Sequence, residues 1–212
     1  MNKQFLGILF VIVALLVGVF VLTKDKSSDP ADAGQVSNHV TGKGTKGVTL
    51  IEYGDFQCPA CKSYYPIVKE VRKAYGDDVK FVFRHLPLIQ IHNNAFIASR
   101  AAEAAGLQGK FFEMHDLMYE NQESWSQLPD PTQTFEQFAA QLELNQQQFK
   151  QDMSSETVSA TINADIQEAR AAGAASTPTF VINGERIEEN PQDVKGFKAL
   201  IDEAIAKSKN SQ

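Results

Sequence analysis

The feature that most constrains this chain is a pair of cysteines placed where a strand gives way to a helix. Residues 48–53 read Val-Thr-Leu-Ile-Glu-Tyr, an apolar and β-branched run that predicts a buried strand. A short turn leads to residues 58–61, Cys-Pro-Ala-Cys, whose proline occupies the first position of a helix predicted over residues 59–75. Cys58 and Cys61 are the only cysteines in the sequence, so whatever chemistry they perform they perform together.

This placement predicts two thiols of different reactivity. Cys58 would meet the unpaired N–H groups and the positive end of the helix dipole, both of which stabilise a thiolate. Cys61 lies one turn further along the same face, where the helix shields it but leaves it able to attack a disulfide formed at Cys58. We therefore expect Cys58 to be the nucleophile and Cys61 the resolving thiol.

A metal site is the alternative use of such a cysteine pair. Two cysteines need two further ligands to complete a zinc site. The four histidines of the sequence, His39, His85, His92 and His115, show no pairing at the spacing typical of zinc ligands. We therefore predict that the chain uses no metal.

Two other positions bear on the thiol pair. Glu52 is an acid inside an apolar strand. If it is buried in the sheet, its pKa should be raised and it could accept a proton from Cys61. If it lies at a strand edge instead, its carboxylate faces solvent. Pro178 follows Thr177 at the head of a strand that reads as internal, where proline is confined to the first position. A cis bond would bring a backbone edge to the cysteines, although base rates alone favour trans.

The rest of the pattern is α/β with a long helical interruption. Residues 79–83 predict a second strand, and almost nothing within 93–173 reads as strand. Strand character returns at 179–182, followed by an Asn-Gly hairpin signal and a final helix capped by Asn190 and Pro191. The order is therefore β-α-β, a helical insertion, a β-hairpin and a last helix.

The N-terminal segment predicts attachment to a membrane. Residues 5–22, FLGILFVIVALLVGVFVL, carry no charge, and at ~1.5 Å per residue they nearly cross a hydrocarbon core of ~30 Å. A cleaved signal peptide would have a shorter apolar stretch with a small-residue site close behind it, but here the nearest Ala-x-Ala is at 31–33. We favour an uncleaved transmembrane anchor over a cleaved signal.

These patterns divide the chain into four parts. We expect an anchor or signal at 1–23, a polar linker at 24–37, a catalytic domain at 38–207 and a flexible tail at 208–212. With 43% apolar and 22% charged residues the domain can bury a core of its own. The formal charge of −6 provides no basic surface for nucleic acid.

Together these motifs resemble the thioredoxin superfamily. Glu52 six residues before the Cys-Pro-x-Cys motif, with Thr-Pro-Thr-Phe-Val-Ile-Asn-Gly at 177–184, is a specific combination, and the long helical block is similar to the DsbA-like branch of thiol-disulfide oxidoreductases. The resemblance spans residues 40–207 and is closest in kind to membrane-tethered members that lie outside the bacterial cytoplasmic membrane. It implies an α/β thioredoxin fold with a large helical insertion at about 93–173, preceded by a transmembrane helix.

The resemblance also implies roles for single residues. Cys58 becomes the exposed nucleophile, Cys61 the resolving cysteine and Glu52 the buried acid. Pro178 becomes the cis proline beside the disulfide. Pro59 and Ala60 of the active-site motif, with Thr177, complete the active site and substrate-binding loop.

The activity implied is disulfide formation without a bound cofactor. Its partners would be unfolded or partly folded cysteine-containing secreted proteins and a quinone-linked thiol oxidase of the membrane. The protein would cross the cytoplasmic membrane once, with its catalytic domain on the periplasmic or cell-surface side.

Two departures keep other functions open. Ala60 stands where the best-known DsbA has a thiolate-stabilising histidine, and Thr177 resembles disulfide isomerases. We expect an oxidase; the alternatives are a reductase or isomerase of the same fold, or a non-catalytic thioredoxin-like binding module or holdase.

Overall fold

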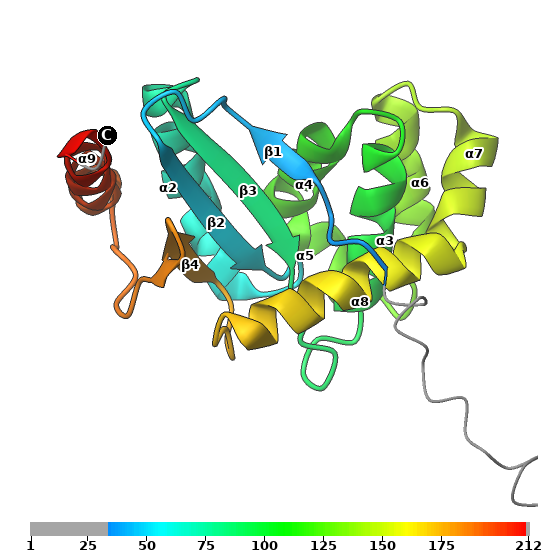
Figure 1. Cartoon of the computed structure of the whole chain (residues 1–212). Helices are drawn as coiled ribbons and strands as arrows, with labels where there is room; N and C mark the ends of the chain where they lie inside the picture. The colour runs from blue at the N-terminus through cyan, green and yellow to red at the C-terminus, as the bar shows by residue number, and fades with distance from the viewer. Residues whose placement is uncertain (1–33, 211–212) are drawn as a thin grey trace, which may run out of the picture. The chain divides into compact units, whose positions relative to one another are not determined.

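A five-stranded sheet organises the part of the chain that the computed structural model describes, residues 34–210 (Figure 1). The strands are β1 (His39–Thr41), β2 (Val48–Gly54), β3 (Val79–His85), β4 (Thr179–Ile182) and β5 (Glu185–Arg186). Their order is β1-β3-β2-β4-β5, with β2 and β3 parallel and the other neighbours antiparallel. The strand that leads to the cysteines is therefore the central one.

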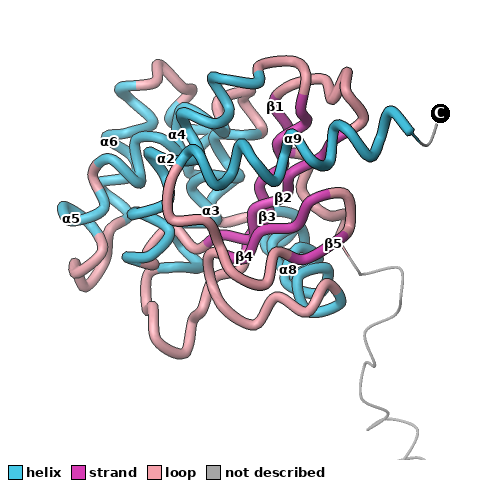
Figure 2. The backbone as a smooth tube through the Cα atoms, turned by 90° about the vertical axis from the view of Figure 1, so that its left-hand side faces the viewer, coloured by secondary structure: helices cyan, strands magenta, loops and turns pink. Residues whose placement is uncertain are grey.

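Helices cover both faces of this sheet. α2 (Pro59–Tyr75) and α9 (Val194–Asn210) pack on the face that carries Leu50 and Phe180, and α8 (Glu156–Ala171) packs on the opposite face against Tyr53. Figure 2 shows α9 lying across the strands. Alternation along β2 places Glu52 on the same side as Leu50, so this acid faces α2.

The predicted helical insertion is confirmed. It begins after β3 and ends before β4, and its helices pack in a core rich in alanine and aromatic residues that also includes Phe83 of β3 and Cys61 and Tyr65 of α2. The helices before α8 are α3 (Ala95–Gly106), α4 (Phe111–Glu120), α5 (Gln122–Trp125), α6 (Thr132–Gln141) and α7 (Gln146–Met153). The insertion therefore lies between two strands of the sheet, and the elements outside it follow the predicted order of strand, helix, strand, hairpin and final helix.

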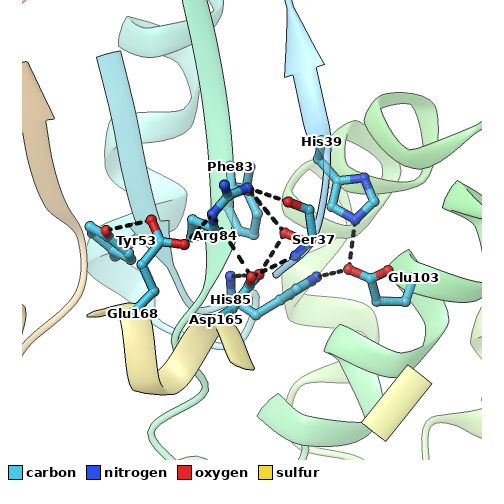
Figure 3. Close-up of polar contacts among 9 residues, drawn as sticks. All are labelled: Ser37, His39, Tyr53, Phe83, Arg84, His85, Glu103, Asp165 and Glu168. Carbon is cyan, nitrogen blue, oxygen red and sulfur yellow. Dashed lines mark hydrogen bonds and ion pairs between the residues drawn. The ribbon is translucent and has the colours of Figure 1, made fainter. Parts of the chain in front are cut away.

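The predicted linker does not extend to residue 37. Ser37 is only 4% exposed, because its N–H and its hydroxyl donate to the carboxylate of Asp165 in α8 at 2.8 and 2.6 Å (Figure 3). His39 then begins β1, which pairs with β3. The prediction failed here because a short polar segment ordered by a distant buried carboxylate has no apolar periodicity of its own.

The C-terminal end also differs from the prediction. Asp193, rather than Asn190 and Pro191, caps the last helix, since its carboxylate accepts the N–H of Gly196 at 2.7 Å. α9 continues past 208, the predicted start of the tail, and the hydroxyl of Ser208 donates to the Gly47 carbonyl at 2.9 Å.

The membrane anchor predicted at residues 5–22 lies outside the described residues. Within residues 34–210, no helix combines the length and the apolar character needed to cross a bilayer.

Asp165 provides a test of how the N-terminal segment is held. It is fully buried and accepts hydrogen bonds from Ser37 and from the His85 N–H, so Asp165→Ala should leave those donors unpaired and destabilise the fold by about 3–5 kcal/mol. The measurement is urea unfolding of the full chain. Asp77→Ala, which removes an exposed ion pair with Lys43, should cost far less, because exposed ion pairs contribute little to stability. Equal losses for the two variants would contradict this account.

Candidate active site

The turn between β2 and α2 is fixed by side chains buried on either side of it. Asp55 is fully buried; its carboxylate accepts the N–H of Gln57 at 2.8 Å and its carbonyl accepts the N–H of Cys58 at 3.1 Å. The amide of Gln122, in α5, donates to the carbonyls of Phe56 and Cys58 at 2.8 and 3.0 Å. The Cys58 carbonyl also accepts the N–H of Lys62 at 3.1 Å, and together these bonds set the position of Cys58.

Cys58 stands at the N-terminus of α2 as an ionisable thiol. It is 7% exposed and is not bonded to Cys61 in the structure. The pKa of Cys58 is lowered to about 5, first because the Cys61 side chain hydrogen-bonds to its sulfur, and further because the N–H groups of Ala60 and Cys61 point toward it. At neutral pH the sulfur of Cys58 is therefore a thiolate.

Cys61 has the opposite tendency. It is fully buried, and burial raises its pKa well above the usual value, with further contributions from the negative charges of Cys58 and Glu52. The two sulfurs thus form a couple in which Cys58, the less deeply buried of the two, is ionised, while Cys61 keeps its proton and donates it in a hydrogen bond. This is the arrangement required for one cysteine to attack or leave and the other to resolve.

The structure brings Thr177 and Pro178 to the same sulfur. The Thr177–Pro178 bond is cis, as the resemblance implied and against the expectation from base rates. The Cys58 thiol donates to the Thr177 carbonyl at 3.5 Å. The Thr177 hydroxyl has no hydrogen-bond partner among the described residues, and it contributes to the lowered pKa of Cys58 by donating to the sulfur once that is ionised.

Glu52 lies inside the sheet and not at its edge. Its neighbours across β3 and β4 are Phe83 and Phe180, and its side chain is 7% exposed. Burial raises the pKa of Glu52 to about 7, although the nearby Arg72 guanidinium acts in the opposite direction. The solvent-facing alternative is therefore wrong.

A small cavity adjoins this carboxyl. It has a volume of about 20 Å³, enough for one water molecule, and Glu52, Arg72, His115 and Tyr119 are among its lining residues. A carboxyl that titrates near neutral pH, coupled by charge to Cys61 and bordering such a cavity, has the properties of a proton acceptor.

One group of potential metal ligands occurs among residues 34–210, and it contains neither cysteine. His39, His85 and Glu103 bring their donor atoms within 4.8 Å of one another. Both imidazole Nε2 atoms contact the same Glu103 oxygen, at 2.6 and 2.7 Å (Figure 3). Burial raises the pKa of Glu103, but hydrogen bonds from the histidines outweigh it and hold the value at about 2. These hydrogen bonds tie β1 and β3 to α3, although Nδ1 of His85 has no hydrogen-bond partner among the described residues.

Sequence reasoning missed Asp55 and Gln122. Asp55 had one available signal: it is an acid in the short turn before Cys58, where a carboxylate can accept nearby N–H groups. Gln122 had none, because its role depends on α5 packing against a turn 64 positions away.

Comparison with known proteins agrees with this fold. A family profile described as Thioredoxin matches residues 35–203. The chain belongs to the thioredoxin family. Among its thioredoxin-fold relatives of known structure, three can be compared directly. Oxidised BdbD from Bacillus subtilis is 25% identical with a TM-score of 0.70, and the match covers 82% of this chain and 97% of that one. A thioredoxin-like oxidoreductase from Silicibacter pomeroyi is 25% identical with a TM-score of 0.65, over 83% of this chain and 93% of that one. DsbA2 from Pseudomonas aeruginosa is 29% identical with a TM-score of 0.61, over 80% of this chain and 95% of that one.

Curated sequence relatives of this thioredoxin-family chain are much longer proteins. Na(+)/H(+) antiporter NhaA 3 of Salinispora tropica is 34% identical over 172 residues, and NhaA 1 of Mycolicibacterium gilvum is 38% identical over 153 residues. These matches cover 81% and 70% of this chain but only 25% and 24% of the antiporters. The chain thus spans about a quarter of their length.

The fold and the family agree on the class of chemistry. The chain is a DsbA-like member of the thioredoxin superfamily, and one of the solved structures that it resembles is a thioredoxin-like oxidoreductase.

The raised pKa of Glu52 predicts a pH-dependent stability. Because folding favours the protonated carboxyl, the folded protein loses stability as pH rises from 4.5 to about 7, by about 3 kcal/mol in total. Glu52→Gln has no such titration, so its stability relative to the native chain should grow by that amount between pH 4 and pH 8. Urea unfolding with reduced cysteines measures this difference. Glu70→Gln, on the exposed side of α2, should show no such growth; a pH-independent Glu52→Gln would contradict the assignment.

Proposed function

We propose that this protein is an extracytoplasmic disulfide-forming oxidase, tethered to the cytoplasmic membrane by residues 5–22. The observation that carries the proposal is the Cys58 thiol, with a pKa of about 5, placed at a helix N-terminus next to a buried thiol. A stabilised thiolate favours the reduced form of the pair, and so makes the disulfide a stronger oxidant. A non-catalytic binding module has no need of this separation between two thiols.

The exchange reaction follows from the accessibility of the two sulfurs. In the oxidised protein, a client thiolate attacks the Cys58 sulfur; the S–S bond to Cys61 breaks, and Cys61 leaves with the electron pair and takes up a proton. A second client thiolate then attacks the client sulfur of the mixed disulfide. Cys58 leaves as a thiolate, which its low pKa makes a good leaving group, and the client gains a disulfide.

Glu52 supplies or accepts the proton at Cys61. With a pKa of about 7 the carboxyl exists in both forms near neutral pH, so it can protonate the departing Cys61 thiolate and recover that proton when the disulfide is re-formed. The neighbouring cavity gives room for a water molecule in this transfer.

The compartment and the partners belong to the same proposal. Disulfides made by such an enzyme persist only in an oxidising environment outside the cytoplasm. Clients would be unfolded or partly folded secreted proteins with free cysteines. The two electrons gained per cycle would pass to a quinone-linked thiol oxidase in the membrane that holds the anchor.

The reduction potential tests the direction of the reaction. A Cys58 pKa of about 5 lies between that of thioredoxin, about 7, and that of DsbA, about 3.5, whose potentials are about −270 and −120 mV. We expect about −180 mV at pH 7, measured by equilibration with glutathione buffers. The potential should fall by about 30 mV per pH unit above pH 5, because only one thiol takes up a proton on reduction, and by about 59 mV per unit below it. A value near −270 mV would make the protein a reductase instead.

Trapping experiments test the roles of the two cysteines. Cys61→Ala keeps the accessible nucleophile and removes the resolving thiol, so mixed disulfides with clients should accumulate. Cys58→Ala is the matched control and should trap none. Non-reducing gels of cell extracts distinguish the two results, and equal trapping by both variants would overturn the assignment.

A further inference from the structure

His115, on α4, is a buried titratable side chain that the proposed thiol exchange does not use. It is 4% exposed, and aromatic rings surround it, with ring centroids at 4.9 Å for Tyr119 and 5.2 Å for Phe83. It nevertheless lines the same cavity as the Glu52 carboxyl. The fold thus places an imidazole and a carboxyl, each able to exchange a proton, on the walls of one water-sized space.

The two ring nitrogens of His115 have different surroundings. Nδ1 contacts a carboxylate oxygen of Asp116 at 2.9 Å, and because a carboxylate only accepts hydrogen bonds, Nδ1 carries the proton. Nε2 bonds to none of the residues 34–210, so in this tautomer it can accept a proton from water in the cavity that the ring lines. The imidazole therefore has an acceptor for the cavity and a donor for Asp116.

Asp116 connects the imidazole to solvent. Its side chain is 26% exposed, and its other carboxylate oxygen pairs with Nζ of Lys69 at 3.1 Å. Burial raises the pKa of Asp116, but hydrogen bonds from His115 and Lys69 outweigh burial and keep the pKa below its usual value. The carboxylate is therefore ionised at neutral pH, and a proton that it receives from Nδ1 passes readily to bulk water.

We propose that His115 relays protons between Glu52 and solvent, through a water molecule in the cavity on one side and through Asp116 on the other. This inference rests on the proposed function and deepens it. Glu52 is only 7% exposed, so a carboxyl that exchanges protons with the buried thiol needs a route by which it exchanges them with solvent. His115 acts through Glu52, and it is a relay residue of the reaction.

The two halves of the catalytic cycle return the imidazole to its starting form. In the reduced protein, whose cysteines are free, re-forming the disulfide requires Cys61 to lose its proton. That proton passes to Glu52 and then, through water, to Nε2 of His115, while the Nδ1 proton leaves through Asp116. When a client next reduces the disulfide, a proton enters at Nδ1 and the Nε2 proton moves to Glu52 and Cys61. The first tautomer is restored without a turn of the ring.

The groups around His115 keep it from storing the proton that it passes on. Burial lowers the pKa of His115, and although Asp116 raises it, Arg72 of α2 and His85 of β3 lower it further. The neutral imidazole is therefore the resting form at pH 7. The guanidinium of Arg72 lines the same cavity, where it can orient water but cannot release a proton. The other titratable side chains whose rings face the imidazole keep their protons, because burial raises their pKa values; they are Tyr65 and Tyr119.

The experiment follows oxidation of the reduced full chain by oxidised glutathione, in the same mild detergent throughout. The Cys58 thiolate attacks glutathione disulfide and releases one glutathione thiolate; Cys61 then loses its proton, attacks the Cys58 sulfur and releases the second. Rapid acid quenching and mass analysis measure how fast the mixed disulfide forms and how fast it is resolved. Only the second step requires a proton to leave the buried thiol.

Two variants interrupt the relay at different points. His115→Gln keeps a hydrogen-bond donor for the neighbouring carboxylate but has no ring to pass a proton, and Asp116→Asn keeps an acceptor that does not take up a proton. Each should slow resolution about tenfold or more and leave formation of the mixed disulfide unchanged. Glu120→Gln is the matched control, since Glu120 also lies on α4 and pairs with Lys69, at 2.9 Å. It should resolve at the native rate.

A double variant distinguishes a relay from a structural role. If Glu52 and His115 act in series, Glu52→Gln/His115→Gln should resolve no more slowly than the slower single variant. A structural role of His115 would instead multiply the two losses, and the relay would then be wrong. Equal slowing by Glu120→Gln and Asp116→Asn would also contradict it, because surface charge in general would be responsible.

The outcomes separate this inference from the proposed function. If Glu52→Gln slows resolution while His115→Gln and Asp116→Asn do not, the relay is wrong and the proposed role of Glu52 stands. If Glu52→Gln itself resolves at the native rate, the proposed proton transfer at Glu52 fails, and the relay fails with it. If the native chain forms no mixed disulfide with glutathione, the proposed exchange activity fails as a whole.

Discussion

The hydrogen bond between the two cysteine side chains is the interaction on which the active site depends. Cys61 can donate only while it keeps its proton, and it keeps that proton because it is fully buried near Glu52. Cys58 can give up its proton because it receives this bond together with the N–H groups at the start of α2. One helical turn thus makes an acid and a base from two chemically identical side chains, with no metal or cofactor invoked.

The sheet completes this separation by placing a carboxyl where its charge is costly. Glu52 lies between two phenylalanines on the central strand, and the pKa of about 7 shows how strongly burial disfavours its ionised form. An apolar residue at this position would fit the strand better. The strand is therefore less stable at neutral pH, and the proton transfer that we propose for Glu52 would be the return for that loss of stability.

Local pattern was enough to predict the parts of this site that are local. The strand-turn-helix around Cys58, the helical insertion and the strand after Pro178 follow from residue type and spacing, and the family resemblance assigned roles to Glu52 and Pro178. Position alone could not say that Glu52 is internal, because that depends on β4 pairing with β2 from far along the chain.

What sequence reasoning missed depends on pairings between distant residues. Ser37 meets Asp165 across 128 positions, and Asp55 meets His92 across 37. Trp125 lies in a polar stretch of the sequence, yet it is fully buried, and its indole N–H donates to the Met118 carbonyl at 3.0 Å. None of these partners is marked by periodicity, since a single polar contact between folded segments leaves no repeat in the sequence.

The way the helical insertion joins the sheet has a mechanical consequence. The chain leaves the sheet through the loop after β3, which bonds to Asp55 in the turn before Cys58, and returns to it just before Thr177, whose carbonyl contacts the Cys58 sulfur. A rigid-body rotation of the six inserted helices would therefore displace both walls of the active site at once. Asp165 and Glu103 oppose such a rotation, because each joins an inserted helix to the strand β3 through His85. The geometry around the thiols therefore depends on the hydrogen bonds that join Asp165 of α8 and Glu103 of α3 to His85.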